Sequence, residues 1–262
     1  MQRESIHTNP FFHSFEQPIA DYPVPENFAL MHEDAPHPLC ILAAEALQYH
    51  LDHEAEWDHN FGLGDNKNKM VIGKMFGVLV VKTTAGDIGY LKAFSGKLAG
   101  KNHHPTFVPP VFDSLADNSF VNSGMTELTR IIQNIKELEV EKPADYETKI
   151  KALKSRRKDH SVALQQQIFD HYHFLNKAGV ERSLLELFKD ASYKNPPSGA
   201  GECAGPKLLQ YAFQHNMQPL AMAEFWWGLS PKSAFWKHGH YYACCKEKCE
   251  PILVHMLKGI DD

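Results

Sequence analysis

The sequence lacks several features that would place a protein in a membrane, outside the cell or on nucleic acid. No apolar run approaches the roughly 20 residues that a membrane span needs. The stretch from Met1 to Glu16 is polar and has no apolar segment typical of a secretory signal. Positive charge is not in excess, because the net charge is −5 and the isoelectric point is about 6.3. These absences predict a cytoplasmic protein with no membrane partner, and they argue against attachment to nucleic acid by overall charge alone.

Familiar nucleotide-binding and hydrolase motifs are also missing. There is no phosphate-binding glycine loop followed by Lys-Ser or Lys-Thr, and there is no Gly-x-Ser-x-Gly elbow. Residues 199–201, Gly-Ala-Gly, lack the third glycine and the preceding strand of a dinucleotide-binding fingerprint. These positions therefore carry no functional prediction.

Cysteine is scarce and unevenly placed. The chain has five cysteines in 262 residues, an odd number, and no secretory signal accompanies them. This combination favours reduced thiols or metal ligands over disulfides. Four of the five lie in the last 60 residues, and the full set is Cys40, Cys203, Cys244, Cys245 and Cys249.

The composition that remains is that of an ordinary globular protein, with 43% apolar and 23% charged residues. The length fits one large domain or two small ones. Residues 1–37 are rich in Pro, His and acidic residues and predict an N-terminal arm lying across the domain. Phe11, Phe12 and Phe15 are its expected anchors, and a mobile tail is the alternative.

Local patterns predict a helix and a hairpin after the arm. Apolar residues at three- and four-residue steps predict a helix over 38–54. Two β-rich runs around the turn at 84–87 predict a hairpin over 70–95. The run from Val78 to Val81 is apolar on both faces, which predicts a central strand covered on both sides.

Two charged helices are expected next. Apolar stripes begin at Met125 and Tyr146 on either side of a break near Pro143, so residues 123–190 predict an antiparallel helical-hairpin insertion. The second helix is expected to run to Leu175. It carries a basic run that could contact RNA phosphates, with Lys154, Arg156, Arg157 and Lys158 as the candidate RNA-binding residues. The alternative is a solvated helix face paired with neighbouring glutamates.

The last third predicts the rest of an α/β core formed by residues 38–122 and 191–262. A helix is expected over 202–215, a strand over 219–227 and a final helix over 245–257. The expected fold class is therefore mixed α+β or α/β, a small mixed sheet with flanking helices and a long helical-hairpin insertion.

The cysteines fall at the starts of two of these helices. Cys203 opens one, and Cys245 and Cys249 lie at i and i+4 of the other, where both sulfurs can face one ion. We therefore predict a zinc site at these three residues, with His238, His240 or water as the fourth ligand. The alternative is that the cysteines are small buried residues.

The order of elements resembles the core of the cytidine-deaminase-like fold: a helix, a hairpin, a ligand-bearing helix, a strand, and a helix opened by two cysteines. Such enzymes place a proton-shuttling Glu two residues after the first ligand and separate the two cysteines by two residues. Here Gly205 takes the shuttle position, and three residues separate Cys245 from Cys249. The resemblance thus implies a degenerate, structural or substrate-binding version, with an active zinc-dependent deaminase-like hydrolase as the alternative.

Aromatic residues gather close to the cysteines in sequence. Lys232, Trp236 and Lys237 are candidates for stacking and neutralising unpaired RNA. The alternative assigns one tryptophan of the pair Trp226 and Trp227 to the core, because a strand buries alternate residues. The full aromatic set is Trp226, Trp227, Phe235, Trp236, Tyr241 and Tyr242.

Several long strings resemble the N-terminal extension of bacterial RluA-type pseudouridine synthases. They are residues 197–209 (PSGAGECAGPKLL), 222–228 (MAEFWWG), 238–239 (HG), 245–253 (CKEKCEPIL), 73–80 (GKMFGVLV), 89–96 (GYLKAFSG) and 107–113 (FVPPVFD).

The resemblance implies a role in RNA modification without the catalytic step. The attacking Asp of that family lies in an Arg-Leu-Asp motif, which does not occur here, and the catalytic module is expected beyond Asp262. We therefore predict an accessory, RNA-binding domain that works with a synthase catalytic domain in cis or in trans, on ribosomal or transfer RNA. A structural docking module is a further alternative.

Overall fold

The computed structural model describes residues 9–30, 35–54, 56–64, 70–189, 191 and 194–261. The chain forms two compact units, one of Met1–Val111 with Phe174–Asp262 and the other of Phe112–His173. The sequence predicted the helical insertion at residues 123–190, whereas the second unit spans Phe112–His173. No helix among the described residues is long and apolar enough to cross a membrane.

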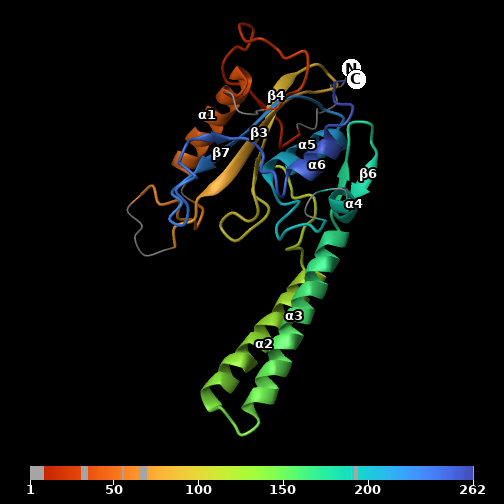
Figure 1. Ribbon diagram of the computed structural model, residues 1–262. Helices are drawn as coiled ribbons and strands as arrows, with labels where there is room; N and C mark the ends of the chain where they lie inside the picture. The colour runs from red at the N-terminus through yellow and green to blue at the C-terminus, as the bar shows by residue number, and fades with distance from the viewer. Residues whose placement is uncertain are drawn as a thin grey trace, which may run out of the picture. The chain divides into compact units, whose positions relative to one another are not determined.

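The first unit is built around a small mixed sheet (Figure 1). Its strands run in the order β1-β4-β3-β7-β2, and β8 also pairs with β7. All pairs are antiparallel except β2 with β7, which is parallel. The strands are β1 His13–Ser14, β2 Ala29–Leu30, β3 Lys74–Lys82, β4 Ile88–Phe94, β7 Gln218–Trp227 and β8 Tyr241–Tyr242. With six helices among the described residues, the mixed α/β class is confirmed.

The central hairpin forms where the sequence predicted it. Its turn is closed by the Thr83 N–H donating to Asp87 O at 2.8 Å and the Gly86 N–H donating to Thr83 O at 2.9 Å. Gly86 has φ +93°, a left-handed conformation that favours glycine. Val78 to Val81 are fully buried, because β3 lies between β4 and β7 with helices on both faces of the sheet.

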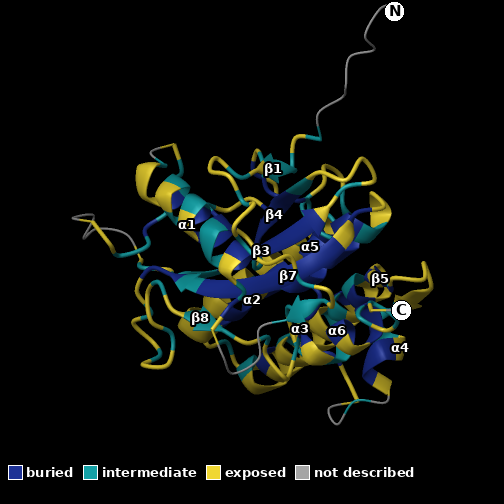
Figure 2. Cartoon of the chain, turned by 90° about the horizontal axis from the view of Figure 1, so that it is seen from above, coloured by how far each residue is buried: buried dark blue, intermediate teal, exposed yellow. Residues whose placement is uncertain are grey.

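Helix α1 (Pro38–His53) packs on one face of the sheet, and α5 (Ala204–Gln214) packs on the other (Figures 1 and 2). The close approach of α5 depends on Gly77, where an added Cβ would lie 3.0 Å from Ala204 Cβ. Helix α6 (Glu250–Met256) packs against α5, and α4 (Leu184–Lys189) packs against α6. A two-stranded sheet of β5 (His173–Leu175) and β6 (Glu181–Ser183) precedes α4.

The N-terminal arm is anchored by the expected phenylalanines. Phe11 packs edge-on against Tyr211 of α5 with ring centroids 5.3 Å apart, and Phe15 packs against Tyr90 at 5.3 Å. The space beside Gly89 is filled by Phe12. Residues 1–8 and 31–34 of the predicted arm lie outside the described residues.

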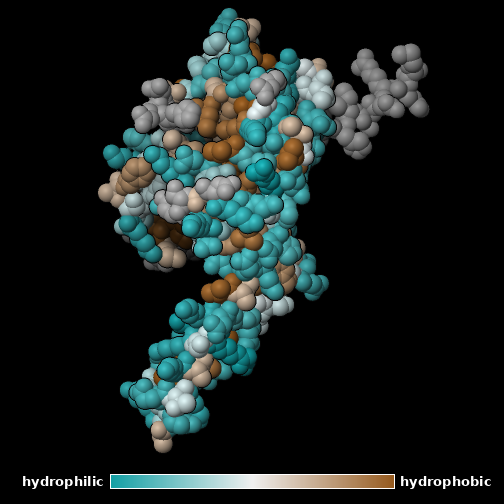
Figure 3. All heavy atoms as spheres, turned by 45° about the vertical axis from the view of Figure 1, so that its right-hand side comes forward, coloured by the Kyte–Doolittle hydropathy of each residue, from teal (hydrophilic) through white to brown (hydrophobic). Residues whose placement is uncertain are grey.

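The second unit is a pair of helices, α2 (Phe120–Glu141) and α3 (Tyr146–Asp170). Their apolar seam contains Ile131, Ile135, Leu138 and Ile150. The surface of this pair is mainly hydrophilic (Figure 3). Helix α2 starts at Phe120, before the expected Met125, because the Ser119 hydroxyl accepts from the Val121 N–H at 3.1 Å and caps the helix.

Two helix ends differ from the sequence prediction. Helix α3 stops at Asp170 instead of continuing to Leu175, because residues 173–175 are extended and pair with β6. Helix α6 starts at Glu250 rather than Cys245. Cys245 O accepts from the Cys249 N–H at 3.2 Å and the Glu250 N–H at 3.1 Å, so residues 246–249 form a turn. Pro251 suits the first helical turn, where no N–H partner is needed.

Candidate metal centre and aromatic loop

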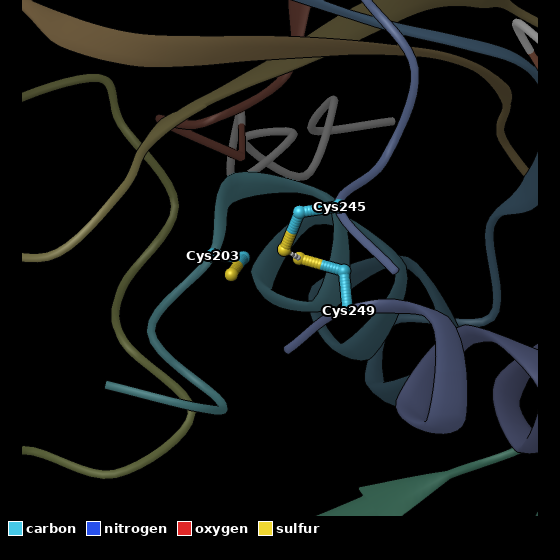
Figure 4. Close-up of side chains that lie close together, drawn as sticks. All are labelled: Cys203, Cys245 and Cys249. Atoms are coloured by element: carbon cyan, nitrogen blue, oxygen red, sulfur yellow. Dashed lines mark hydrogen bonds between the residues drawn. The ribbon is translucent and has the colours of Figure 1, made fainter. Parts of the chain in front are cut away.

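Three thiols meet in the first unit, as the sequence predicted. The sulfurs of Cys203, Cys245 and Cys249 all lie within 4.8 Å of one another. Figure 4 shows the Cys245 and Cys249 sulfurs facing each other, 3.4 Å apart, with Cys203 beside them. That distance is far longer than the roughly 2.05 Å of a disulfide, so the cluster consists of free thiols.

Each thiol is positioned by a turn rather than by a helix face. Cys203 is the N-cap residue of α5, and its neighbour Ala204 donates from its N–H to the Ser95 hydroxyl at 3.3 Å. Gly199 and Gly201 have φ of +78° and +90°, which lets the preceding loop fold back to the sheet. Cys249 is the N-cap residue of α6, and Cys245 lies one turn before it.

Hydrogen bonds among the three thiols shift their pKa values in opposite directions. Hydrogen bonds with Cys203 and Cys249 lower the pKa of the Cys245 thiol well below its usual range. The pKa of the Cys203 thiol is raised, first by its hydrogen bond to Cys245. That of Cys249 is raised by its hydrogen bonds to Cys203 and Cys245. The arrangement therefore stabilises one thiolate among three sulfurs.

The geometry suits a tetrahedral thiolate-binding metal. A zinc ion with Zn–S bonds of about 2.3 Å holds its sulfurs about 3.8 Å apart. The 3.4 Å Cys245–Cys249 separation and the 4.8 Å limit for the group bracket that value. Cys244 lies outside the group, and burial raises its pKa to about 11.

The structure does not bring His238 to the thiols. Its Nδ1 accepts from the Gly228 N–H at 3.1 Å, and its ring packs edge-on against Trp227 at 4.3 Å. Both contacts hold the ring against the end of β7, so the group of close ligand atoms contains three sulfurs and no histidine among the described residues. His240, the other candidate, is exposed and outside the group.

A buried carboxylate lies next to this cluster. Glu224 is 7% exposed on β7, and its Oε1 accepts from the Gly205 N–H at 3.0 Å. Burial raises its pKa to about 7. A Cβ at Gly205 would lie 3.7 Å from that oxygen. A carboxylate from the strand therefore lies against Gly205 at the start of α5.

The signal for Glu224 was present in the strand pattern. Alternate residues of β7 face α5, and Glu224 is the acidic residue among them, two positions from Met222 and Trp226. Linear spacing from Cys203 could not show this, because the strand and the helix start meet only in the folded unit.

A buried lysine ties the same helix to the sheet. Lys207 is 3% exposed, and its Nζ donates to Phe94 O at 2.9 Å and Gly96 O at 3.4 Å. Burial lowers its pKa to about 8, and the nearby Glu202 acts in the opposite direction. Lys207 thus fastens the start of α5 to the end of β4, beside Cys203.

The aromatic residues after β7 form one cluster. Trp236 stacks on Trp226 with ring centroids 5.2 Å apart and an interplanar angle of 18°. Phe235 and Tyr242 each pack edge-on against Trp236 with ring centroids 4.8 Å apart. Trp227 is 4% exposed and belongs to the core, as strand alternation predicts for one of the pair. Phe235, which belongs to the aromatic set identified in the sequence, is 66% exposed.

The loop is held by its own backbone and hydroxyl contacts. The Tyr242 hydroxyl donates to Phe235 O at 2.8 Å and accepts from the Lys237 N–H at 2.8 Å. Lys232 and Lys237 are exposed and flank Phe235 and Trp236 in the sequence. Residues 225–246 contain Lys232, Lys237 and Lys246 and no Asp or Glu.

The basic run on α3 is partly neutralised within the second unit. Arg156 pairs with Glu127 at 2.8 Å, and Lys154 pairs with Glu139 at 3.3 Å. Arg157 and Lys158 are exposed. These pairs favour the solvated-face interpretation for Lys154 and Arg156, because their charges already have partners.

Comparison with known proteins found no match: no family model, no curated protein and no solved structure matches the chain.

Proposed function

We propose that this chain is a zinc-binding accessory domain that contacts single-stranded RNA for an RluA-type pseudouridine synthase. The observation that carries the proposal is the aromatic cluster on the acid-free segment 225–246, which ends at the thiol group. The strings that resemble the synthase extension coincide with this segment and with the two cysteine-bearing turns.

The aromatic cluster suits unpaired bases. Phe235 offers a ring that is 66% exposed, and Trp236 is already fixed against Trp226, so little side-chain entropy is lost when a base stacks. Lys232 and Lys237 flank these residues in the sequence and are exposed, so their charges are available to phosphates. Base stacking on such rings contributes about 1–3 kcal/mol per base.

The thiol group would hold zinc through Cys203, Cys245 and Cys249. When bound, the ion cross-links the start of α5 to the turn before α6. Cys245 lies three residues after β8, so this link would fix the end of the aromatic loop. Metal binding is therefore expected to order the surface that contacts RNA.

Fluorescence anisotropy with labelled tRNA and ribosomal RNA stem-loops tests the proposal. Phe235→Ala and Trp236→Ala should each weaken binding about tenfold or more. Tyr49→Ala is the matched control, because Tyr49 is an equally exposed aromatic residue, at 68%, on α1. Absence of binding by the wild-type protein at low salt would refute the RNA-binding role.

A zinc-dependent, deaminase-like hydrolase is the second candidate, favoured by Glu224. Three sulfurs leave a fourth position open, which is typical of catalytic sites in which zinc activates water. Glu224 would hold the proton at its carboxylate beside that position. Zinc analysis, followed by an ammonia-release assay with cytidine and adenosine, tests this candidate. Activity lost in Glu224→Gln and kept in Glu202→Gln would support it, whereas no zinc or no ammonia would exclude it.

A further inference from the structure

Two of the three clustered sulfurs are close enough to bond to each other after a small movement. The Cys245 and Cys249 sulfurs are 3.4 Å apart, and Figure 4 shows them directed at one another with the Cys203 sulfur to one side. A disulfide holds its sulfurs about 2.05 Å apart, so this pair would have to approach by roughly 1.4 Å. The present separation is already shorter than the roughly 3.8 Å that a tetrahedral zinc ion imposes on two sulfurs.

The backbone between the two residues suits such a bond. The Cys249 N–H donates to Cys245 O at 3.2 Å, so residues 245–249 form one helical turn. Residues i and i+4 of a helical turn have Cα atoms about 6 Å apart. Disulfides bridge Cα separations of roughly 4.4–6.8 Å, so a bond across this turn needs side-chain adjustment and little backbone movement.

Cys245 is the member of the pair that is free to move. It is exposed and precedes α6, whereas Cys249 is 2% exposed and is the N-cap residue of that helix. Residues 243–245 form an irregular segment, and Ala243 and Lys246 on either side are also exposed. Exposure also gives a soluble oxidant access to Cys245, so oxidation is expected to begin at this residue.

Cys203 is a less suitable partner, because α5 fixes it in place. The next residue, Ala204, is fully buried, and its N–H donates to the Ser95 hydroxyl at 3.3 Å. Cys244 lies outside the group of close sulfurs. The geometry therefore favours the pair Cys245 and Cys249.

We propose that hydrogen peroxide oxidises Cys245 and Cys249 to a disulfide, which makes the thiol group a redox switch. The Cys245 sulfur attacks the peroxide: an S–O bond forms, the O–O bond breaks, and the departing hydroxide leaves as water with the thiol proton. The Cys249 sulfur then attacks Cys245: the S–S bond forms, the S–O bond breaks, and a second water carries away the Cys249 proton. The two thiols lose two electrons in total, and the peroxide gains them.

The disulfide and a bound zinc ion exclude each other. The bond removes two of the three clustered sulfurs from the ligand set, and Cys203 alone cannot replace them. Oxidation would thus release the link between the start of α5 and the turn before α6, and with it the order of the aromatic loop. This consequence rests on the proposed function, whereas the disulfide itself rests only on the positions of the two sulfurs.

Peptide mapping of the full chain tests the disulfide. The metal-free protein is treated with hydrogen peroxide, alkylated and digested with trypsin. Lys246 and Lys248 lie between the two cysteines, so trypsin places them in separate peptides, 238–246 and 249–258, while Cys203 falls in 195–207. We expect 238–246 to be joined to 249–258 with the loss of two hydrogen atoms, and dithiothreitol to reverse the link. Absence of this link, or a link through Cys203 instead, would overturn the proposal.

Substitutions assign the two roles. Cys249→Ser should stop the reaction at a sulfenic acid on Cys245, which dimedone traps as a stable adduct. Cys244→Ser is the matched control and should keep the full yield of disulfide, because Cys244 is adjacent in sequence but outside the group. Loss of the disulfide in Cys244→Ser would overturn the pairing, and the wild-type peptide map decides the matter even where a variant fails to fold.

The zinc-loaded protein separates this proposal from the proposed function. Zinc content is measured first, and peroxide should then release one zinc ion per disulfide formed, as followed with a chromogenic chelator. A disulfide in a protein that binds no zinc would refute the zinc-binding role and leave the oxidation of the two thiols supported. Zinc that stays bound after the disulfide has formed would overturn the switch.

Discussion

The two faces of the central sheet each bury a lysine, but in opposite ways. On the α5 face, Lys207 donates to the carbonyl oxygens of Phe94 and Gly96 and has Glu202 nearby. On the α1 face, the Lys92 Nζ lies 4.9 Å from the centroid of the Phe107 ring. Burial lowers the pKa of both to about 8. The same burial thus accompanies carbonyl acceptors on one face and an aromatic ring on the other.

The largest effect is expected on the α5 face, from loss of a thiol. Cys249 is 2% exposed and contributes one of the three clustered sulfurs. Cys249→Ser should abolish zinc binding and lower the free energy of unfolding by about 4 kcal/mol, because metal affinity is coupled to folding. Zinc content by mass spectrometry and urea unfolding measure both.

Cys244→Ser is the matched control for this change, because Cys244 is adjacent in sequence but outside the cluster. Equal zinc content in Cys249→Ser and the wild-type protein would show that these cysteines do not form a zinc site.

The α1 face should respond to alkaline pH through Lys92. Its pKa falls from 10.5 to about 8 on folding, so the folded state disfavours the charged form. Its contribution to stability is full above pH 10.5 and is lost as the pH falls through about 8. The free energy of unfolding should therefore rise by about 2–3 kcal/mol from pH 8 to 10.5 in the wild-type protein relative to Lys92→Met.

Urea unfolding at several pH values measures this difference, and comparison with the variant cancels the other groups that titrate in this range. Parallel curves for the two proteins would mean that Lys92 is solvated in the folded state.

Replacing each of the two lysines by methionine should change the free energy of unfolding at pH 7 by different amounts. Lys207→Met leaves the carbonyl oxygens of Phe94 and Gly96 without their donor and should cost about 2 kcal/mol. Lys92→Met removes the contact with the Phe107 ring together with the unfavourable burial of the charge, and it should therefore cost less than about 1 kcal/mol. Chemical unfolding of both variants measures these changes. Equal losses of stability would show that the two buried lysines do not differ in this way.

The smallest effect concerns how closely α5 approaches the sheet. Gly77→Ala places a Cβ 3.0 Å from Ala204 Cβ and should cost about 1 kcal/mol by displacing the start of α5. Gly64→Ala is the control, because nothing lies within 4 Å of its added Cβ. Thermal unfolding distinguishes them, and a neutral Gly77→Ala would show that α5 has room to move.

Local patterns predicted most of the elements. Turn chemistry gave the β3–β4 hairpin, and apolar periodicity gave α1, α5 and the helical pair. The cysteine cluster was also predicted, although its mechanism differed: Cys245 and Cys249 meet through a turn and an N-cap, not along a helix face. The final helix was predicted to start too early because its first turn is set by hydrogen bonds to Cys245 O, which periodicity does not reveal.

The contacts that sequence reasoning could not supply join distant segments of the chain. Glu224 accepts a hydrogen bond from the Gly205 N–H across the strand–helix interface, and Lys92 lies over the ring of Phe107 from a later loop. A lysine or glutamate inside an otherwise apolar strand is the available signal, but its partners are known only after the sheet is assembled. His238 failed as a ligand for the same reason, since its ring is held by Gly228 and Trp227.

The pairing of β3 with β7 has a consequence for how the protein is made. These neighbouring strands span Lys74–Lys82 and Gln218–Trp227, so the segment between them must be synthesised before the sheet can close. At ribosomal speed this takes on the order of ten seconds. During that time the strand segment Val78–Val81, which is apolar on both faces, can pair only with β4. Helices α2 and α3 can already pair locally in the same period. Nascent chains stalled before Gln218 should therefore depend most strongly on chaperones.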